Sequence, residues 1–198
     1  MKIKYCIICA RAGSKGLKNK NILKLSNKLL LEHTLDQALK SKIFDRVIIT
    51  TNIIKVLSKF KNSKNISFLK RKKNLSSDKS EKIFSIRDAV LKIEKLYNEK
   101  SSFIFDLDVT SPLRNVVDIK KAFNIFKNNK LDNLFSVNKS RKNPYFNMIE
   151  ISKNKVVKKI KKINSKTVVR RQDAPKVYDM NASIYIWKRN ILFKKNYL

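Results

Sequence analysis

Residues 5 to 21 read Tyr5-Cys6-Ile7-Ile8-Cys9-Ala10-Arg11-Ala12-Gly13-Ser14-Lys15-Gly16-Leu17-Lys18-Asn19-Lys20-Asn21. The apolar run at 5–10 is typical of a buried parallel strand. The basic segment after it holds both glycines of the sequence. Glycine is needed where φ is positive or where a ligand approaches the backbone closely. An ordinary basic turn is the alternative, but the pattern favours a phosphate-binding loop at the end of a strand.

The composition is that of a folded and strongly basic protein. The 198 residues suit one domain with a sizeable core, and 42% hydrophobic residues argue against disorder. The formal net charge is +32, but lysines are spread over nearly every segment. A nucleic-acid-binding module would need clustered cations with stacking aromatics. We therefore expect no nucleic-acid partner, and the charge favours polyanionic substrates such as nucleoside triphosphates.

No apolar run approaches the roughly 18 residues of a membrane-spanning helix, so no membrane contact is expected. The first residues lead straight into the strand without a cleavage-site pattern, so no signal peptide is expected. Cys6 and Cys9 lie three apart on a strand and point to opposite faces. We expect them to be buried thiols of a cytoplasmic protein.

Apolar periodicity alternates between strands and helices along most of the chain, which indicates an α/β fold. We expect further strands at 45–52, 66–69, 103–108 and 133–138, and helices at 29–40, 53–60, 83–97 and 116–126. From residue 139 this alternation gives way to short strands. A hairpin at 145–151 and 156–160 would belong to a small β-rich excursion over about 139–180.

A second polar motif follows the expected strand at 103–108, where the chain reads Val109-Thr110-Ser111-Pro112-Leu113-Arg114. Asp106 and Asp108 are two apart on this strand and share a face, as carboxylates that grip a magnesium ion would. The alternative for Asp106 is a helix cap or an ion pair inside the sheet edge.

Over nearly its whole length the chain resembles the acylneuraminate cytidylyltransferases, the CMP-sialic acid synthetase family. Residues 11–16 followed by Lys20 and Asn21 match the family signature R-[GA]-G-S-K-G-x-x-x-K-N, and Thr110 to Arg114 match its T-S-P-L-R. Further matches are Arg71, Leu75 and Asp78, then Arg171, Gln172, Pro175 and Asn181. The version Asp-Leu-Asp-Val-Thr-Ser-Pro-Leu-Arg is most similar to the branch acting on legionaminic-type nonulosonic acids.

The resemblance implies a three-layer α/β/α, Rossmann-like nucleotide-diphospho-sugar transferase fold with a mostly parallel sheet. It implies one cytidylyltransferase domain over 1–198 that transfers CMP from CTP to the anomeric hydroxyl of a nonulosonic acid and releases pyrophosphate, with Mg²⁺. The excursion would make the interface of a homodimer. The alternatives are a 3-deoxy-manno-octulosonate cytidylyltransferase or other sugar nucleotidyltransferase of this fold, or a catalytically weak relative.

The site residues are assigned by resemblance and by the charge that the reaction must neutralise. Catalysis is expected of Lys20 and Arg11, and metal binding of Asp106 and Asp108. Nucleotide binding is expected of Arg11, Ala12, Gly13, Ser14, Lys15, Gly16, Lys20, Asn21, Arg71, Asp78 and Ser80. Binding of the sugar substrate is expected of Asp108, Thr110, Ser111, Arg114, Arg171, Gln172 and Asn181.

The chain departs from the family at several positions. Lys72 stands where the family has proline, and Asp179 where sialic-acid-specific members often have arginine. Members continue past the final strand and helix to an acidic D-x-D element that ligates magnesium, and this chain reaches Leu198 without an equivalent there. We therefore expect the C-terminal end of the family domain to be missing. The alternatives are that Asp106 and Asp108 hold the metal together with substrate oxygens, or that catalysis is weak or absent.

Overall fold

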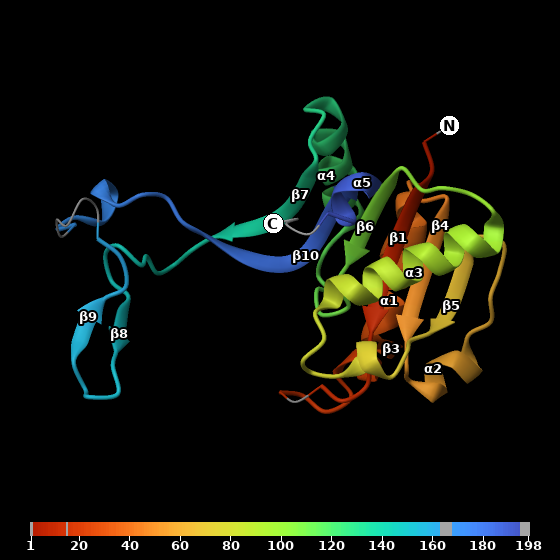
Figure 1. Ribbon diagram of the computed structural model, residues 1–198, viewed down its shortest axis with the longest axis horizontal. Helices are drawn as coiled ribbons and strands as arrows, with labels where there is room; N and C mark the ends of the chain where they lie inside the picture. Colours follow the sequence, from red (N-terminus) through yellow and green to blue (C-terminus); the bar gives the residue numbers. More distant parts are fainter. Residues whose placement is uncertain (1, 15, 163–167, 195–198) are drawn as a thin grey trace. The chain divides into compact units, whose positions relative to one another are not determined.

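The computed structural model describes residues 2–14, 16–162 and 168–194 (Figure 1). The chain divides into two compact units, Met1–Ser136 with Ala182–Leu198, and Val137–Asn181. The second unit spans nearly the same residues as the excursion expected at 139–180.

The helices and strands follow the expected α/β alternation. In chain order they are β1 Lys4–Ala10, β2 Lys24–Leu25, β3 Lys28–Leu29, α1 Leu30–Ser41, β4 Arg46–Thr51, α2 Ile54–Lys59, β5 Ile66–Lys70, α3 Lys82–Tyr97, β6 Phe103–Leu107, α4 Val116–Asn128, β7 Asn133–Lys139, β8 Ile149–Ile151, β9 Val157–Lys159, β10 Tyr178–Lys188 and α5 Arg189–Leu192. Short 3-10 turns span Lys20–Ile22, Asn74–Ser76 and Arg171–Asp173.

The main sheet of the described residues has the strand order β5-β4-β1-β6-β10-β7. β1 pairs in parallel with β4 and β6, and β4 pairs in parallel with β5. β10 runs antiparallel to β6 and places Tyr185 opposite Asp106. The predicted mostly parallel sheet is therefore confirmed, and the carboxyl ends of β1, β4 and β6 meet at one edge.

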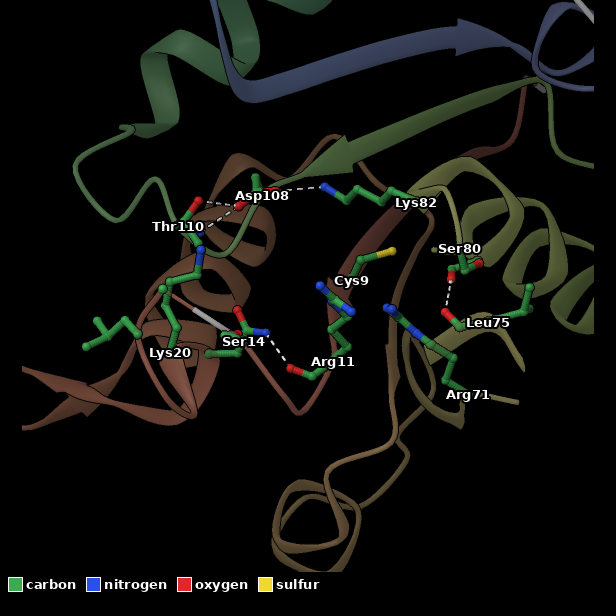
Figure 2. Close-up of a pocket in the computed structure, with 14 residues that line it drawn as sticks. Cys9, Arg11, Ser14, Lys20, Arg71, Leu75, Ser80, Lys82, Asp108 and Thr110 are labelled. Carbon is green, nitrogen blue, oxygen red and sulfur yellow. Dashed lines mark hydrogen bonds and ion pairs between the residues drawn. The ribbon is translucent and has the colours of Figure 1, made fainter. Parts of the chain in front are cut away.

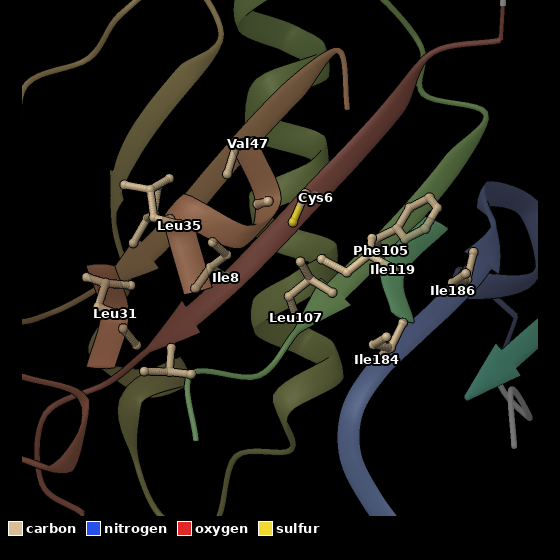
Figure 3. Packing of buried hydrophobic residues seen from close by; sticks show 14 of the residues in the cluster. Cys6, Ile8, Leu31, Leu35, Val47, Phe105, Leu107, Ile119, Ile184 and Ile186 are labelled. Atoms are coloured by element: carbon tan, nitrogen blue, oxygen red, sulfur yellow. The ribbon is translucent and has the colours of Figure 1, made fainter. Parts of the chain in front are cut away.

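Apolar side chains on alternate positions of β1 bury both faces of the sheet. Cys6 and Ile8 pack with residues of α1 and α4 in one cluster, part of which is drawn in Figure 3. Tyr5 and Ile7 pack against α3 on the other face, and Cys9 joins that second cluster. The two cysteines thus face opposite sides of the sheet, as their spacing predicts, and the layers are α/β/α.

The short strands differ most from the expectation. The β2–β3 hairpin was not predicted, because each strand has two residues and its turn, Ser26 and Asn27 at φ 48° and 67°, contains no glycine. The hairpin expected at 145–151 and 156–160 forms with only three residues in each strand. In the described residues, none of the helices has the length and apolar character needed to cross a membrane.

A partly buried ion pair links the start of β4 to the segment after α3 and to Tyr5 of β1. Arg46 binds Glu99 through both its Nε and Nη2 atoms, and the Tyr5 hydroxyl donates to Glu99 Oε1 at 2.7 Å. The Arg46 guanidinium also lies 3.4 Å from the centroid of the Tyr97 ring. Hydrogen bonding by Arg46 lowers the pKa of Glu99, against the opposing effect of partial burial.

We expect Glu99→Gln to lower the free energy of unfolding by about 2 kcal/mol at neutral pH, because it leaves the Arg46 charge without its partner. A carboxyl whose folded-state pKa is lowered stabilises the fold above its unfolded pKa, about 4.3, and loses that contribution as the pH falls through the folded value. Urea denaturation should therefore show the difference between the variant and the wild type shrinking below about pH 4. A difference that does not change with pH would contradict this.

Candidate nucleotide-binding site

A cavity of about 360 Å³ opens at the carboxyl edge of the sheet, where β1 and β6 end (Figure 2). The residues expected from the sequence that line it are Arg11, Ser14, Gly16, Lys20, Asn21, Arg71, Ser80, Asp108 and Thr110. Five other lining residues were not assigned to the site from the sequence, although Leu75 matched the family there: Cys9, Leu17, Leu75, Lys82 and Ser85. Segments far apart in the sequence thus meet at one cationic cavity.

The loop after β1 turns at Gly13, whose φ is +78°. A Cβ atom built at Gly13 would meet no heavy atom within 4 Å, and the same holds at Gly16. Glycine is therefore required at position 13 by backbone conformation and not by crowding.

We expect Gly13→Ala to lower the free energy of unfolding by about 1 kcal/mol, because an L residue is strained at positive φ. Gly16→Ala is the matched control, since Gly16 does not adopt a left-handed φ. Its effect should be within about 0.5 kcal/mol. Urea denaturation of both variants measures the difference, and equal destabilisation would contradict the role given to Gly13.

Two asparagine side chains hydrogen-bond the backbone of the loop. The Asn21 side chain, 6% exposed, donates from Nδ2 to the Arg11 carbonyl at 2.8 Å. The Asn52 Oδ1 atom accepts from the Ala12 amide at 2.8 Å. Asn21, expected as a nucleotide contact, therefore also positions the loop, and the Ala12 amide is already engaged by protein.

Arg11 and Arg71 place guanidinium groups on the cavity wall. Arg11 Nη1 lies 2.7 Å from Asp78 Oδ1. Asp78 thus holds Arg11 and is not among the described lining residues, and the nucleotide contact expected of it stays a prediction. Arg71 is 5% exposed and donates from Nη2 to the Thr50 carbonyl at 2.9 Å. Its Nε atom has no hydrogen-bond partner in the described part of the chain.

A lysine stands between the two carboxylates expected to hold a metal. Lys82 Nζ, at the start of α3, lies 2.6 Å from Asp106 Oδ2 and 2.9 Å from Asp108 Oδ2 (Figure 2 draws the second contact). The two aspartates do share one face, as their spacing predicts. The ion-pair alternative for Asp106 is the arrangement that the structure shows.

The pKa values in this cluster follow from burial and from the shared cation. Burial raises the pKa of Asp106, and the nearby charge of Lys82 opposes that shift only in part. Burial also acts to raise the pKa of Asp108, but Lys82 and Thr110 outweigh it and lower the value to about 2. Burial acts to lower the pKa of Lys82, and the two carboxylates raise it overall. Lys82 and Asp108 are therefore both charged at neutral pH.

The turn after β6 is built on Asp108. Its Oδ1 atom accepts from the Thr110 amide at 2.8 Å and from the Thr110 hydroxyl at 2.6 Å. Arg114 is 7% exposed and donates to the carbonyls of Asp108 and Ser183 at 3.2 and 2.6 Å. Arg114 therefore supports this turn and is not among the described lining residues, and the substrate-binding role expected of it stays a prediction.

Several other predicted residues are not among the described lining residues of this cavity. Ser111 donates its amide to the Asp108 carbonyl at 3.4 Å, and Ala12 and Gly13 belong to the loop without lining the described cavity. Lys15 lies outside the described residues. In the second unit, Arg171 and Gln172 line a separate cavity of about 730 Å³.

That second cavity is also cationic, with Lys139, Lys142 and Lys176 among its lining residues. Asn181, at the boundary of the second unit, donates from Nδ2 to Asn138 Oδ1 at 3.0 Å. The sugar-binding roles expected of Arg171, Gln172 and Asn181 stay predictions.

The chain is similar over most of its length to two Campylobacter proteins. The chain is 43% identical over 194 residues to the post-translational flagellin modification protein B of Campylobacter coli, covering 96% of this chain and 80% of that protein. It is 43% identical over 191 residues to the CMP-N,N'-diacetyllegionaminic acid synthase of Campylobacter jejuni, with the same coverage of 96% and 80%.

A solved structure of CMP:2-keto-3-deoxy-manno-octonic acid synthetase with CTP superposes with a TM-score of 0.64. The superposition covers 96% of this chain and 76% of that one, and the 13% sequence identity makes it a likeness of fold. The sequence model of the cytidylyltransferase family matches residues 5–198. With its parallel sheet and its cationic cavity at the sheet edge, the chain belongs to the cytidylyltransferase family and is a nucleotidyltransferase.

Proposed function

We propose that this chain transfers CMP from CTP to the anomeric hydroxyl of a nonulosonic acid, preferentially one of the legionaminic type, and releases pyrophosphate. The observation that carries the proposal is the cavity at the ends of β1 and β6, where Arg11, Lys20 and Arg71 meet. The likeness to a CMP-N,N'-diacetyllegionaminic acid synthase over 96% of the chain supports the sugar class.

The reaction needs positioning and charge neutralisation more than covalent chemistry by the protein. The anomeric oxygen attacks the α-phosphorus of CTP in line, and the new oxygen–phosphorus bond replaces the bond to the β-phosphate. The hydroxyl proton leaves to solvent, and pyrophosphate departs with the electron pair of the broken bond. Cations along the path of the departing phosphates stabilise this charge.

The described lining residues provide such cations. Arg11, Lys20, Arg71 and Lys82 carry positive charge, against the carboxylate of Asp108. Arg11 and Lys20 lie on the loop that follows β1, next to the backbone turn at Gly13. We assign the triphosphate to this loop and the cytidine to the wall formed by Arg71 and Ser80.

Magnesium is expected to accompany the triphosphate and to neutralise part of its charge. Asp106 and Asp108 do not fit a magnesium ion shared between them, because the ammonium of Lys82 is bound by both carboxylates. We therefore propose that the metal enters with CTP. Removing divalent cations with a chelator should abolish turnover, and restored turnover on adding Mg²⁺ completes the test.

We further propose that two copies of the chain associate through the second unit. Its hairpin strands carry apolar side chains that are largely exposed, with Ile149 at 55%, Ile151 at 64% and Val157 at 56%. Light scattering should give the mass of a dimer for the wild type, and Ile151→Lys should give a monomer. A wild-type monomer would overturn the assignment. We place the reaction in the cytoplasm, where CTP is available.

Pyrophosphate release tests the function directly. The protein is incubated with CTP and, in turn, N,N'-diacetyllegionaminic acid, N-acetylneuraminic acid and 3-deoxy-manno-octulosonic acid. We expect release with the first acid to exceed that with the others by about tenfold or more. CTP without a sugar is the blank, and Lys18→Ala, a loop lysine outside the described cavity lining, is the protein control. Release only with 3-deoxy-manno-octulosonic acid, or with none, would overturn the proposal.

A further inference from the structure

Lys82 occupies an unusual position for a cation. It is the first residue of α3, where the positive end of the helix dipole disfavours an ammonium group. Its Nζ atom nevertheless lies within 3 Å of two carboxylate oxygens, at 2.6 Å from Asp106 and 2.9 Å from Asp108. The two carboxylates therefore supply the attraction that the helix end does not.

Asp106 needs a cation because it is buried. The residue is 1% exposed, and its Oδ1 atom has no hydrogen-bond partner among the described residues. An uncompensated carboxylate in such a place is strongly unfavourable. Lys82 is the one basic side chain for which the described part of the chain records an ion pair with Asp106.

Asp108 has both oxygens occupied. Its Oδ2 atom accepts from Lys82, and its Oδ1 atom accepts two hydrogen bonds from Thr110. A divalent ion bridging Asp106 and Asp108 would have to displace the ammonium. The cluster is therefore complete as a set of charges without a metal.

We propose that Lys82 is a built-in cation that takes the place of a metal ion between Asp106 and Asp108, and that it positions Asp108 and the Thr110 turn in the cavity. Lys82 is thus a positioning residue of the pocket. This inference deepens the proposed function, but its first test uses neither CTP nor sugar.

The first test measures Mn²⁺ binding to the nucleotide-free protein by electron paramagnetic resonance at mildly alkaline pH. We expect no stoichiometric binding by the wild type. Lys82→Met removes the ammonium and keeps most of the side-chain volume, so the carboxylate pair should then bind about one Mn²⁺ per chain. Adding Asp106→Asn to Lys82→Met should remove that site.

Lys92→Met is the matched control. Lys92 lies on the same helix and its Nζ pairs with Asp88 Oδ2 at 2.7 Å, away from the cavity. This variant should bind no Mn²⁺. If Lys82→Met does not fold, as judged by its thermal unfolding, Lys82→Gln removes the same charge and retains a hydrogen-bond donor. Stoichiometric Mn²⁺ binding by the wild type that is lost in Asp106→Asn would overturn the proposal, and so would a folded Lys82→Gln or Lys82→Met that gains no site.

Turnover gives a second readout. Lys82→Met should lower kcat by about tenfold or more and change KM for CTP less, and Lys82→Arg should restore part of kcat because it keeps the charge. A loss confined to KM would contradict the positioning role. If the wild type releases no pyrophosphate with any acid, the proposed function fails, whereas the Mn²⁺ result still decides the role of Lys82.

Discussion

Replacing Lys20 with alanine should lower kcat about 100-fold and change the Kd for CTP by less than about fivefold. Lys20 begins the 3-10 turn after the loop and lines the cavity. Its charge should count most when negative charge builds on the departing pyrophosphate, because that charge is greater in the transition state than in bound CTP. Pyrophosphate release gives kcat, and calorimetry with a non-hydrolysable CTP analogue gives Kd.

Lys18→Ala is the control for this prediction. Lys18 is an exposed lysine of the same loop and is not among the described lining residues. It should change neither quantity by more than about twofold. A loss of affinity with kcat unchanged would show that Lys20 serves ground-state binding alone, and equal losses of kcat and affinity would also contradict the role given to it.

Arg11→Ala should weaken CTP binding by about 30-fold or more. Arg11 presents its guanidinium to the cavity from the end of β1, and Asp78 fixes it at 2.7 Å. Removing it deletes a cation that can bind phosphate oxygens bidentately. Titration of the variant with CTP and Mg²⁺ measures the loss.

Two further variants separate the effect of the Arg11 charge from that of its position and from that of a cation outside the cavity lining. Asp78→Asn keeps the Arg11 charge but loosens its position, so it should weaken CTP binding by less than Arg11→Ala. Lys28→Ala removes an exposed lysine that is not among the described lining residues and whose Nζ atom lies 2.5 Å from Asp36 Oδ2. This variant should leave the affinity for CTP unchanged. Unchanged affinity in Arg11→Ala would move the phosphate site elsewhere in the molecule.

The fold was largely predictable because its strands are continuous apolar runs. β1 and β6 are buried on both sides by helices, and a strand of this kind carries its signal in a few consecutive residues. The two-residue strands β2 and β3 and their Ser26–Asn27 turn carry no such signal, since their stability depends on their surroundings. Local pattern therefore located the layers and the β8–β9 hairpin, though with longer strands than form, but it did not locate the β2–β3 hairpin.

The candidate site was predictable where function requires unusual residues. The glycines and cations at 11–20 and the motif at 110–114 were visible in the sequence, and both reach the same sheet edge. The structural role of Arg114 was not predictable, because sequence shows its charge but not the carbonyls to which it donates.

Lys82 was missed because it lies in a segment rich in lysine. One signal was nevertheless present. Lys82 directly precedes the helix expected at 83–97, where a cation is unfavourable. In the structure this helix start meets the sheet edge at the end of β6, where Asp106 and Asp108 lie. A lysine in that position is stabilised only if carboxylates lie nearby, and Asp106 and Asp108, on and just after β6, are those carboxylates.

Cys9 offers a native reporter of what enters the cavity. Of the two thiols in the sequence, Cys6 is fully buried and Cys9 lines the cavity wall. Burial, and secondarily Asp106, raises the pKa of Cys9 to about 11, so its thiol is protonated and slow to react at neutral pH. Alkylation by a small maleimide should therefore be slow in the free protein and slower still once a nucleotide covers the sulfur. Occupancy of the cavity can therefore be followed by the alkylation rate of a native thiol, without introducing a cysteine by mutation.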